Sequence, residues 1–313
     1  MSSMPTREGA IRIFRLFGID VYLHWYWLLV PFFGKSAFPA LFGGSVEWPI
    51  LMFVCLFLIV LMHEFGHALA CRQVGGKADY IILWPLGGVA YASPPQRPGA
   101  TLWTIAAGPL VNVGLFIVLS TFWLCARNLN WPGLYPDWYT FIFNLWELNL
   151  GLLIFNMLPI YPLDGGQIFR SLLWFIVGRA NSLMVASAIG FLGVGALALL
   201  ALTTPSSLML WLLVILVGLT CWSGFQQSQQ LLRLEKAPRR KEFRCPVCQQ
   251  SPPIGKFWRC GKCGTGFDTF ETQAFCPKCN TEYSLTACPF CFNGKPMAEW
   301  KTISTPPPVP PQA

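Results

Sequence analysis

Residues 48–67 read WPILMFVCLFLIVLMHEFGH, an apolar run that ends in the motif His-Glu-Phe-Gly-His and is long enough to enter a bilayer. On a helix, positions i and i+4 share one face, so His63 and His67 can direct ring nitrogens toward one Zn²⁺ with Glu64 beside them. Two buried core histidines are the alternative interpretation. The chain of 313 residues has only three histidines, and Glu64 would otherwise be an uncompensated charge at membrane depth. The pattern therefore favours a metal site.

The composition indicates a polytopic, all-α membrane protein up to about residue 225. Hydrophobic residues make up 54% of the chain and charged residues 12%. A shorter apolar piece, residues 168–177, is expected to dip into or lie along the membrane. Pro31 and Gly34 interrupt the first of the longer runs. The runs of spanning length predict six transmembrane helices near residues 21–42, 48–71, 100–126, 139–160, 182–203 and 207–225.

The positions of Lys and Arg predict the orientation, because cytosolic segments retain positive charge during insertion. Basic residues precede the first span, separate the second from the third and the fourth from the fifth, and follow the sixth. The opposite loops hold only Lys35 and Arg127. This distribution predicts that both termini are cytosolic and that His63 lies near the cytosolic end of the second span. The first apolar run lacks a small-residue cleavage site, so it is expected to be an anchor.

The tail after the last span is basic, with twelve of the 22 Lys and Arg residues beyond residue 225. Because six of them follow a membrane helix directly, they are expected to attract anionic lipid headgroups in the region 233–244. Nucleic-acid binding is the less favoured interpretation of the same charges. The six are Arg233, Lys236, Arg239, Arg240, Lys241 and Arg244.

A catalytic zinc site needs a third protein ligand beside two histidines. Asp164 is the favoured acidic residue because it follows the Pro-interrupted stretch 156–163 at the cytosolic end of the fourth span, where two glycines permit close backbone approach. The charge topology places this end at about the depth of His63. Glu147 lies in mid-span, where it is expected to line a water path or to form an ion pair within the bundle.

Three motifs in order connect these residues: HEFGH at 63–67, AAGPLVN at 106–112 and NMLPIYPLDGG at 156–166. With them the chain resembles the site-2 protease family of intramembrane zinc metalloproteases, over most of residues 10–225. Residues 17–19 and 23–25 resemble the compact bacterial and archaeal branch, which implies a prokaryotic cell (inner) membrane.

The resemblance implies that His63, His67 and Asp164 bind zinc and that Glu64 is the catalytic acid/base. It also implies a membrane-dipping β-hairpin at residues 77–93, which would offer an edge strand to an extended substrate. An ordinary re-entrant loop is the alternative interpretation of that segment.

The chemistry that these residues support is metal-assisted peptide hydrolysis, with Glu64 taking a proton from the attacking water and passing it to the leaving amine. Asn156 and Asn112 are candidate donors to the tetrahedral oxyanion. For Asn112, a helix-to-helix contact beside Gly108 is an equally weighted alternative. His24, next to Trp25, is interpreted as an interfacial residue and not as a ligand.

Eight of the twelve cysteines form four C-x-x-C pairs, which predict two tandem Cys₄ zinc ribbons in the cytosol. The reducing cytosol disfavours disulfides as the alternative. The remaining cysteines, Cys55, Cys71, Cys125 and Cys221, are expected to be buried as small apolar residues. The predicted zinc ligands are Cys245, Cys248, Cys260, Cys263, Cys276, Cys279, Cys288 and Cys291.

The leading hypothesis is an intramembrane zinc endopeptidase with one catalytic and two structural zinc ions, which cleaves single-span membrane proteins. Its ribbons would recruit a substrate tail or a cytosolic protein partner. A catalytically silent membrane adaptor or sensor is the rival, and a zinc transporter is disfavoured by the sparse intramembrane acids. The predicted parts are a cytosolic segment (1–20), the membrane core (21–225), a basic linker (226–244), the ribbons (245–294) and a Pro-rich tail (295–313).

Overall fold

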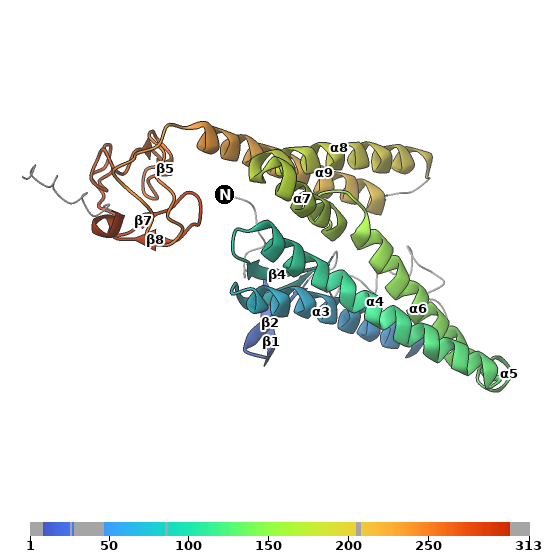
Figure 1. Ribbon diagram of the computed structural model, residues 1–313. Helices are drawn as coiled ribbons and strands as arrows, with labels where there is room; N and C mark the ends of the chain where they lie inside the picture. Colours follow the sequence, from blue (N-terminus) through green and yellow to red (C-terminus); the bar gives the residue numbers. More distant parts are fainter. Residues whose placement is uncertain (1–8, 26, 28–46, 85–86, 205–207, 301–313) are drawn as a thin grey trace, which may run out of the picture. The chain divides into compact units, whose positions relative to one another are not determined.

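The computed structural model describes residues 9–25, 27, 47–84, 87–204 and 208–300 (Figure 1). The chain divides into two compact units, Met1–Gln227 and Ser228–Ala313. Within the described ranges, five helices are long and apolar enough to cross a membrane, in agreement with the second to sixth predicted spans. They are α3 (Glu47–Gln73), α4 (Pro98–Asn128), α6 (Pro136–Met157), α8 (Arg179–Thr203) and α9 (Leu208–Lys236).

The first predicted span, 21–42, falls largely outside the described residues, since 28–46 are not among them. Its first residues are not helical, because Ile19–His24 form strand β2. In β2 the apolar Ile19 and Val21 are buried, whereas Asp20 between them pairs with Arg12 at 2.7 Å. This alternation has the two-residue period of a strand. Because apolar residues follow β2 directly, the sequence pattern predicted a helix that includes the end of this strand.

Helices α3 and α4 pack closely along their length, as Figure 1 shows. Small residues permit this approach: a Cβ added at Gly66 would lie 2.7 Å from the Ala107 carbonyl oxygen and 2.9 Å from Val111. The two helices carry two of the three sequence motifs, so their packing brings HEFGH against AAGPLVN.

The described part of the first unit also has two shorter helices, α5 (Trp131–Leu134) and α7 (Asp164–Val177). At 14 residues α7 is too short to span a bilayer, as predicted for this segment. It buries Gly165, Gly166 and Ser171 against its neighbours and exposes the apolar Phe175 and Ile176. Its first residue is therefore held in the interior of the unit.

A four-stranded sheet packs against α3, with strand order β1-β2-β3-β4. The predicted hairpin is present as the antiparallel pair β3 (Lys77–Trp84) and β4 (Gly87–Ser93), but it is only half of the sheet. The other half is the antiparallel pair of β1 (Ala10–Leu16) and β2, and β2 runs parallel to β3. β1 and β4 are thus the edge strands.

Arg72, in the last turn of α3, ties this sheet to the helix that carries the histidines. Its guanidinium donates to the carbonyl oxygens of Phe17 at 2.6 Å, Gly18 at 3.1 Å and Ala78 at 2.9 Å. One side chain therefore binds three backbone carbonyls, two from the β1–β2 pair and one from the β3–β4 pair. It holds the sheet at a defined place beside the HEFGH motif.

The second unit contains two small antiparallel ribbons and a 3₁₀ helix, η2 (Met297–Trp300). The first ribbon joins β5 (Trp258–Arg259) to β6 (Gly266–Phe267), and the second joins β7 (Thr286–Ala287) to β8 (Gly294–Lys295). Its core gathers Phe270 and Trp300 around Cys245 and Cys288.

The segment predicted as a basic linker is structured. Helix α9 continues to Lys236, beyond the predicted end of the span at 225. Arg240 forms ion pairs with Asp268 at 2.8 Å and Glu271 at 3.0 Å, and Arg239 lies 4.3 Å from the ring centroid of Phe290. Two of the six basic residues assigned to lipid headgroups are therefore engaged inside the second unit.

Candidate metal centres

His63 and His67 of α3 meet Asp164, the first residue of α7, in the interior of the first unit. The His63 Nε2 atom lies 3.0 Å from His67 Nε2 and 3.0 Å from Asp164 Oδ2, and His67 Nε2 lies 3.4 Å from the same oxygen. For bonds of ~2.0 Å at tetrahedral angles, donor atoms around one Zn²⁺ are roughly 3.3 Å apart. The triangle has the size of three ligands of one zinc ion, and no fourth His, Cys, Asp or Glu among the described residues joins the group.

The hydrogen bonds on the far side of each imidazole fix its tautomer. His63 Nδ1 donates to Asn112 Oδ1 at 2.6 Å, and His67 Nδ1 donates to the Thr104 carbonyl oxygen at 2.9 Å. Both Nε2 atoms then carry lone pairs that face Asp164 Oδ2, which is buried and has no hydrogen-bond partner among the described residues. Three electron-rich atoms in contact without a proton between them fit a divalent cation.

Gly108 of α4 lies directly against this triangle, and its role was not predicted. A Cβ at this position would overlap His67 Nε2 and lie 2.8 Å from His63 Nε2. Only glycine leaves room for both rings and an ion between them. The signal in the sequence is a Gly-Pro pair inside an apolar span, but nothing in the pattern says which side chains face it.

The segment that presents Asp164 is folded tightly on itself. A Cβ at Gly165 would overlap the Met157 carbonyl oxygen, and one at Gly166 would lie 2.5 Å from the Ile160 carbonyl carbon. Cys221 Sγ of α9 donates to the Tyr161 carbonyl oxygen at 2.8 Å. The Asp164 carboxylate is therefore positioned by a compact turn that also contacts α9.

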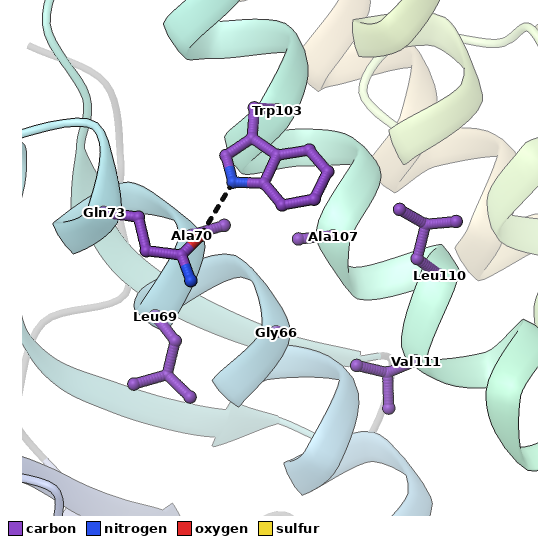
Figure 2. Close-up of a pocket in the computed structure, with 8 residues that line it drawn as sticks. All are labelled: Gly66, Leu69, Ala70, Gln73, Trp103, Ala107, Leu110 and Val111. Atoms are coloured by element: carbon purple, nitrogen blue, oxygen red, sulfur yellow. Dashed lines mark hydrogen bonds between the residues drawn. The ribbon is translucent and has the colours of Figure 1, made fainter.

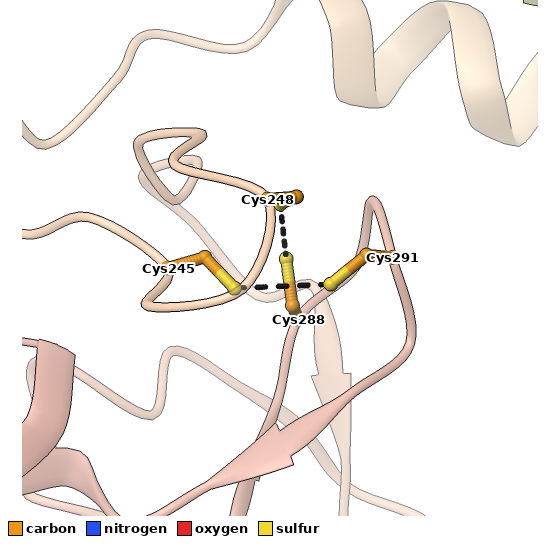
Figure 3. A group of neighbouring side chains, drawn as sticks. All are labelled: Cys245, Cys248, Cys288 and Cys291. Carbon is orange, nitrogen blue, oxygen red and sulfur yellow. Dashed lines mark hydrogen bonds between the residues drawn. The ribbon is translucent and has the colours of Figure 1, made fainter. Parts of the chain in front are cut away.

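The cysteines of the second unit form two groups of four, with the ligand atoms of each group within 4.8 Å of one another. In the first group Cys245 Sγ lies 3.7 Å from Cys291 Sγ, and Cys248 Sγ lies 3.7 Å from Cys288 Sγ (Figure 3). Zn–S bonds of ~2.3 Å in a tetrahedron place sulfur atoms roughly 3.8 Å apart. The group has the dimensions of a closed Cys₄ zinc site.

The second group lies within the sequence limits of the first, which corrects the expectation of tandem ribbons. Cys260 Sγ is 3.5 Å from Cys279 Sγ, and Cys263 Sγ is 3.5 Å from Cys276 Sγ. The first C-x-x-C pair therefore joins the fourth, and the second joins the third. The two Cys₄ sites are nested in the sequence instead of consecutive.

All four C-x-x-C pairs adopt the same turn. In each, the N–H of the first cysteine donates to the carbonyl of the residue five positions on, and its carbonyl accepts from the residue four positions on, at 2.8–3.0 Å. The residue after the second cysteine has a positive φ each time, 58° at Gln249, 72° at Gly264, 50° at Asn280 and 59° at Phe292. Such turns direct both thiols of a pair to one ion.

A tyrosine supports the inner of the two nested sites. The Tyr283 hydroxyl accepts from the Gly261 N–H at 2.8 Å and donates to Cys260 Sγ at 3.0 Å. This hydrogen bond lowers the pKa of the Cys260 thiol to about 5, so the thiolate that binds metal is favoured at neutral pH.

A solved structure shares the architecture of about two thirds of the chain. A solved structure of a site-2 protease from Methanocaldococcus jannaschii matches with a TM-score of 0.51 and 30% sequence identity, over 69% of this chain and 95% of that chain. The model of peptidase family M50 matches residues 51–129 and 134–201. The chain belongs to peptidase family M50.

Curated relatives have similar levels of identity. The zinc metalloprotease MJ0392 of M. jannaschii is 35% identical over 231 residues, which cover 72% of this chain and 62% of that protein. Stage IV sporulation protein FB of Bacillus subtilis is 29% identical over 185 residues, or 57% of this chain and 60% of that protein. The chain thus spans about half to three fifths of the length of the first relatives that it matches.

The family assignment and the five apolar helices make this M50 chain a multi-pass membrane protein. Its HEFGH motif and Asp164 lie inside the part that the family model matches, whereas that match ends at residue 201, before the Cys₄ unit. Zinc is the metal that agrees with both the named relatives and the His, Asp and Cys donor sets.

Asn112 lies on the Nδ1 side of His63, the opposite side of the ring from the metal position. Its oxygen accepts from His63, and its Nδ2 donates to Asn149 Oδ1 of α6 at 2.9 Å. This placement contradicts the predicted role of Asn112 as an oxyanion donor and favours the alternative of a contact between helices, with an added role in orienting His63.

The catalytic roles of Glu64 and Asn156 stay predictions, and the structure gives the burial and the place of each residue. Glu64 is 6% exposed and is next to His63 on α3. Asn156 is half-buried in the last turn of α6, and its side chain forms no hydrogen bond with a residue in the described ranges. It precedes Met157, whose carbonyl oxygen lies against Gly165 in the turn that presents Asp164.

Other predicted side chains differ from expectation. His24 is 4% exposed and stacks on Trp84 with 4.0 Å between ring centroids, so it is a core residue and not an interfacial one. Glu147 is exposed and pairs with no described basic residue. Cys71 and Cys221 are buried as predicted and Cys55 is half-buried, but Cys125 is exposed on α4, because a lipid-facing surface is as apolar as a core.

A shallow groove of about 270 Å³ runs between α3 and α4. Figure 2 shows its lining, in which Trp103 of α4 donates to Gln73 Oε1 of α3 at 2.9 Å and the other labelled residues are apolar. None of the three candidate metal ligands lines it. The groove is therefore a feature of the helix pair and is separate from the three candidate metal ligands.

Proposed function

We propose that this protein is an intramembrane zinc endopeptidase that hydrolyses peptide bonds in or near the transmembrane segments of single-span membrane proteins. The observation that supports this most strongly is the triangle of His63, His67 and Asp164, a group of three donors with Glu64 next to His63 in the sequence. Three protein ligands with an open position are the arrangement of catalytic zinc, whereas structural zinc has four.

Bound in the triangle, Zn²⁺ would act as a Lewis acid that activates water and polarises the scissile carbonyl. Glu64 accepts the proton of the attacking water and donates it to the leaving amine. Asn156 donates to the oxyanion that forms on the substrate carbonyl. Asn112 and the Thr104 carbonyl hold the two imidazoles so that their Nε2 atoms face the reaction.

The sheet beside α3 suits an extended substrate. A transmembrane helix hides its peptide bonds in its own hydrogen bonds, so it must unwind before hydrolysis, and β4 is an edge strand to which unwound chain can add. Arg72 holds this sheet to α3, five residues beyond His67. A substrate paired with β4 would thus lie at a fixed place relative to the metal ligands.

The two Cys₄ sites would hold structural zinc, because four thiolates leave no open position. Their unit would recruit a substrate tail or a cytosolic partner protein. The orientation that accords with this role has both termini in the cytosol of a prokaryotic cell. In that orientation the exposed Arg233, Lys236, Lys241 and Arg244 face anionic lipid headgroups.

The test is cleavage of a helix-destabilised transmembrane reporter by the purified full chain in detergent. Glu64→Gln is expected to lower the rate by at least about 100-fold, because a general base contributes that much or more. Glu47→Gln is the matched control, an exposed acid in the first turn of the same helix, and should cleave at the wild-type rate. Equal rates for wild type and Glu64→Gln would refute the proposal.

A further inference from the structure

Asn149 of α6 is completely buried and forms a reciprocal pair with Asn112 of α4. Asn112 Nδ2 donates to Asn149 Oδ1 at 2.9 Å, and Asn149 Nδ2 donates to the Asn112 backbone carbonyl at 3.0 Å. Asn149 is 0% exposed and Asn112 is 1% exposed. Neither amide therefore has water as an alternative partner.

The pair determines which end of the Asn112 amide meets the metal ligand. The backbone carbonyl of Asn112 can only accept, so it requires the NH₂ of Asn149 and turns Asn149 Oδ1 toward Asn112. That oxygen in turn can only accept, so it requires the NH₂ of Asn112 and leaves Asn112 Oδ1 for His63 Nδ1 at 2.6 Å. A reversed Asn112 amide would present a donor to His63 and favour the proton on Nε2.

We propose that Asn149 is a positioning residue of the membrane metal centre. It acts through Asn112 to hold the proton of His63 on Nδ1 and the lone pair of His63 Nε2 toward the metal. The proposal rests on the proposed zinc site, and it adds a residue that contacts neither the metal nor the substrate.

The two histidines are oriented by different groups. The relay, by which we mean the hydrogen-bonded series Asn149, Asn112 and His63, therefore acts on only one of them. His67 donates to a backbone carbonyl, Thr104, whose orientation is set by helix α4 itself. His63 depends on a side-chain amide that has two orientations, and only Asn149 distinguishes them. The same helix α6 carries Asn156 two turns further on and leads to Asp164, so the relay also fixes α6 relative to His63.

A merely structural contact between α4 and α6 is the alternative, and a double variant separates it from the relay. Asn149→Leu removes the residue that orients Asn112, so the amide is free to reverse. Asn112→Asp in that background restores an oxygen at both ends of the side chain, so His63 again finds an acceptor whichever way the group turns. The bonds between α4 and α6 stay broken in the double variant.

The experiment measures zinc affinity of the membrane site by chelator competition on the full chain in detergent, with the Cys₄ zinc as internal reference. Asn149→Leu is expected to weaken the site by about 10-fold, since partners behind a metal-binding histidine contribute 10–100-fold. The Asn112→Asp/Asn149→Leu variant is expected to recover most of this affinity without recovering the melting temperature. Asn181→Leu, an exposed asparagine in α8, is the control and should match wild type.

Wild-type zinc affinity in Asn149→Leu would overturn the relay, as would a double variant no tighter than Asn149→Leu. Asn149→Ala, which removes the same two bonds without added bulk, gives the same comparison if Asn149→Leu does not fold. A wild-type chain that holds only the two Cys₄ ions would overturn both the relay and the proposed function. A wild-type chain that holds the third ion with unchanged affinity in Asn149→Leu would overturn the relay alone.

Discussion

The candidate metal sites of the two units differ in what surrounds them. The membrane site draws three ligands from α3 and α7, about a hundred positions apart, and the packing of four helices and a tight turn holds them in place. The Cys₄ sites draw four ligands from local turns in a unit with two-residue strands. We therefore expect the fold to form the first site, and metal binding to form the fold around the other two. With three protein ligands the membrane site would keep an open position, whereas four thiolates would fill each Cys₄ site.

The largest expected effect follows from removing one thiolate. Cys288→Ser should unfold the outer Cys₄ site together with Phe270 and Trp300, because metal binding supplies on the order of 10 kcal/mol to such a unit. Limited proteolysis should then release the part after α9 while α3 to α8 remain resistant. Asp164→Asn, which removes one ligand of the membrane site, should leave the proteolytic pattern unchanged. Equal unfolding by both variants would contradict the contrast between the sites.

Gly108→Ala is expected to abolish the membrane site without affecting the fold. The added Cβ displaces His67 and His63, and a ligand misplaced by about 1 Å costs roughly 100-fold in rate. Zinc counting and reporter cleavage on the same preparation measure both effects. Gly114→Ala is the matched control on α4, since no atom lies within 4 Å of its added Cβ. Normal zinc content and rate in Gly108→Ala would show that the site is placed elsewhere.

Tyr283→Phe should have a smaller effect, confined to the inner Cys₄ site. Without the hydroxyl donor the pKa of the Cys260 thiol rises from about 5 toward its ordinary value, and zinc binding must displace a proton from this ligand at neutral pH. Chelator competition is expected to remove one ion per chain a few-fold more readily than from wild type. Equally easy removal of zinc from both Cys₄ sites would mean that Tyr283 stabilises the whole unit and not the inner site alone.

The smallest expected effects concern the shared turn. Phe292→Gly should stabilise the outer site by about 1 kcal/mol, because a bulky residue with φ 59° is strained and glycine is not. Gly264→Ala, at the equivalent position of another turn with φ 72°, should destabilise the inner site by about the same amount. The chelator concentration that removes half of the zinc from the affected site should therefore rise for Phe292→Gly and fall for Gly264→Ala, each relative to wild type.

The sequence predicted what depends on local pattern. Long apolar runs predicted α3, α4, α6, α8 and α9, because only a helix satisfies the backbone in lipid. The i, i+4 spacing predicted that His63 and His67 share a helical face, and the irregular stretch before Asp164 indicated a segment near them. The four C-x-x-C pairs predicted two groups of four thiols.

What the sequence could not predict depends on contacts between distant segments. The separations of the C-x-x-C pairs are compatible with nested or consecutive sites, so the pairing of Cys245 with Cys291 was missed. Gly108 and Asn149 act through neighbours on other helices, and no spacing rule connects them to His63. The sequence did not predict strand β2, because its alternating apolar residues are followed directly by a long apolar run.

The central claim is that one open site performs the chemistry and two closed sites hold the second unit together. The most direct test counts zinc and measures reporter cleavage on the same preparations of wild type, Glu64→Gln and Asp164→Asn. The account predicts about three ions and cleavage for wild type, about three without cleavage for Glu64→Gln, and about two without cleavage for Asp164→Asn. Cleavage by Asp164→Asn at the wild-type rate, or a wild-type chain that holds only two ions, would contradict it.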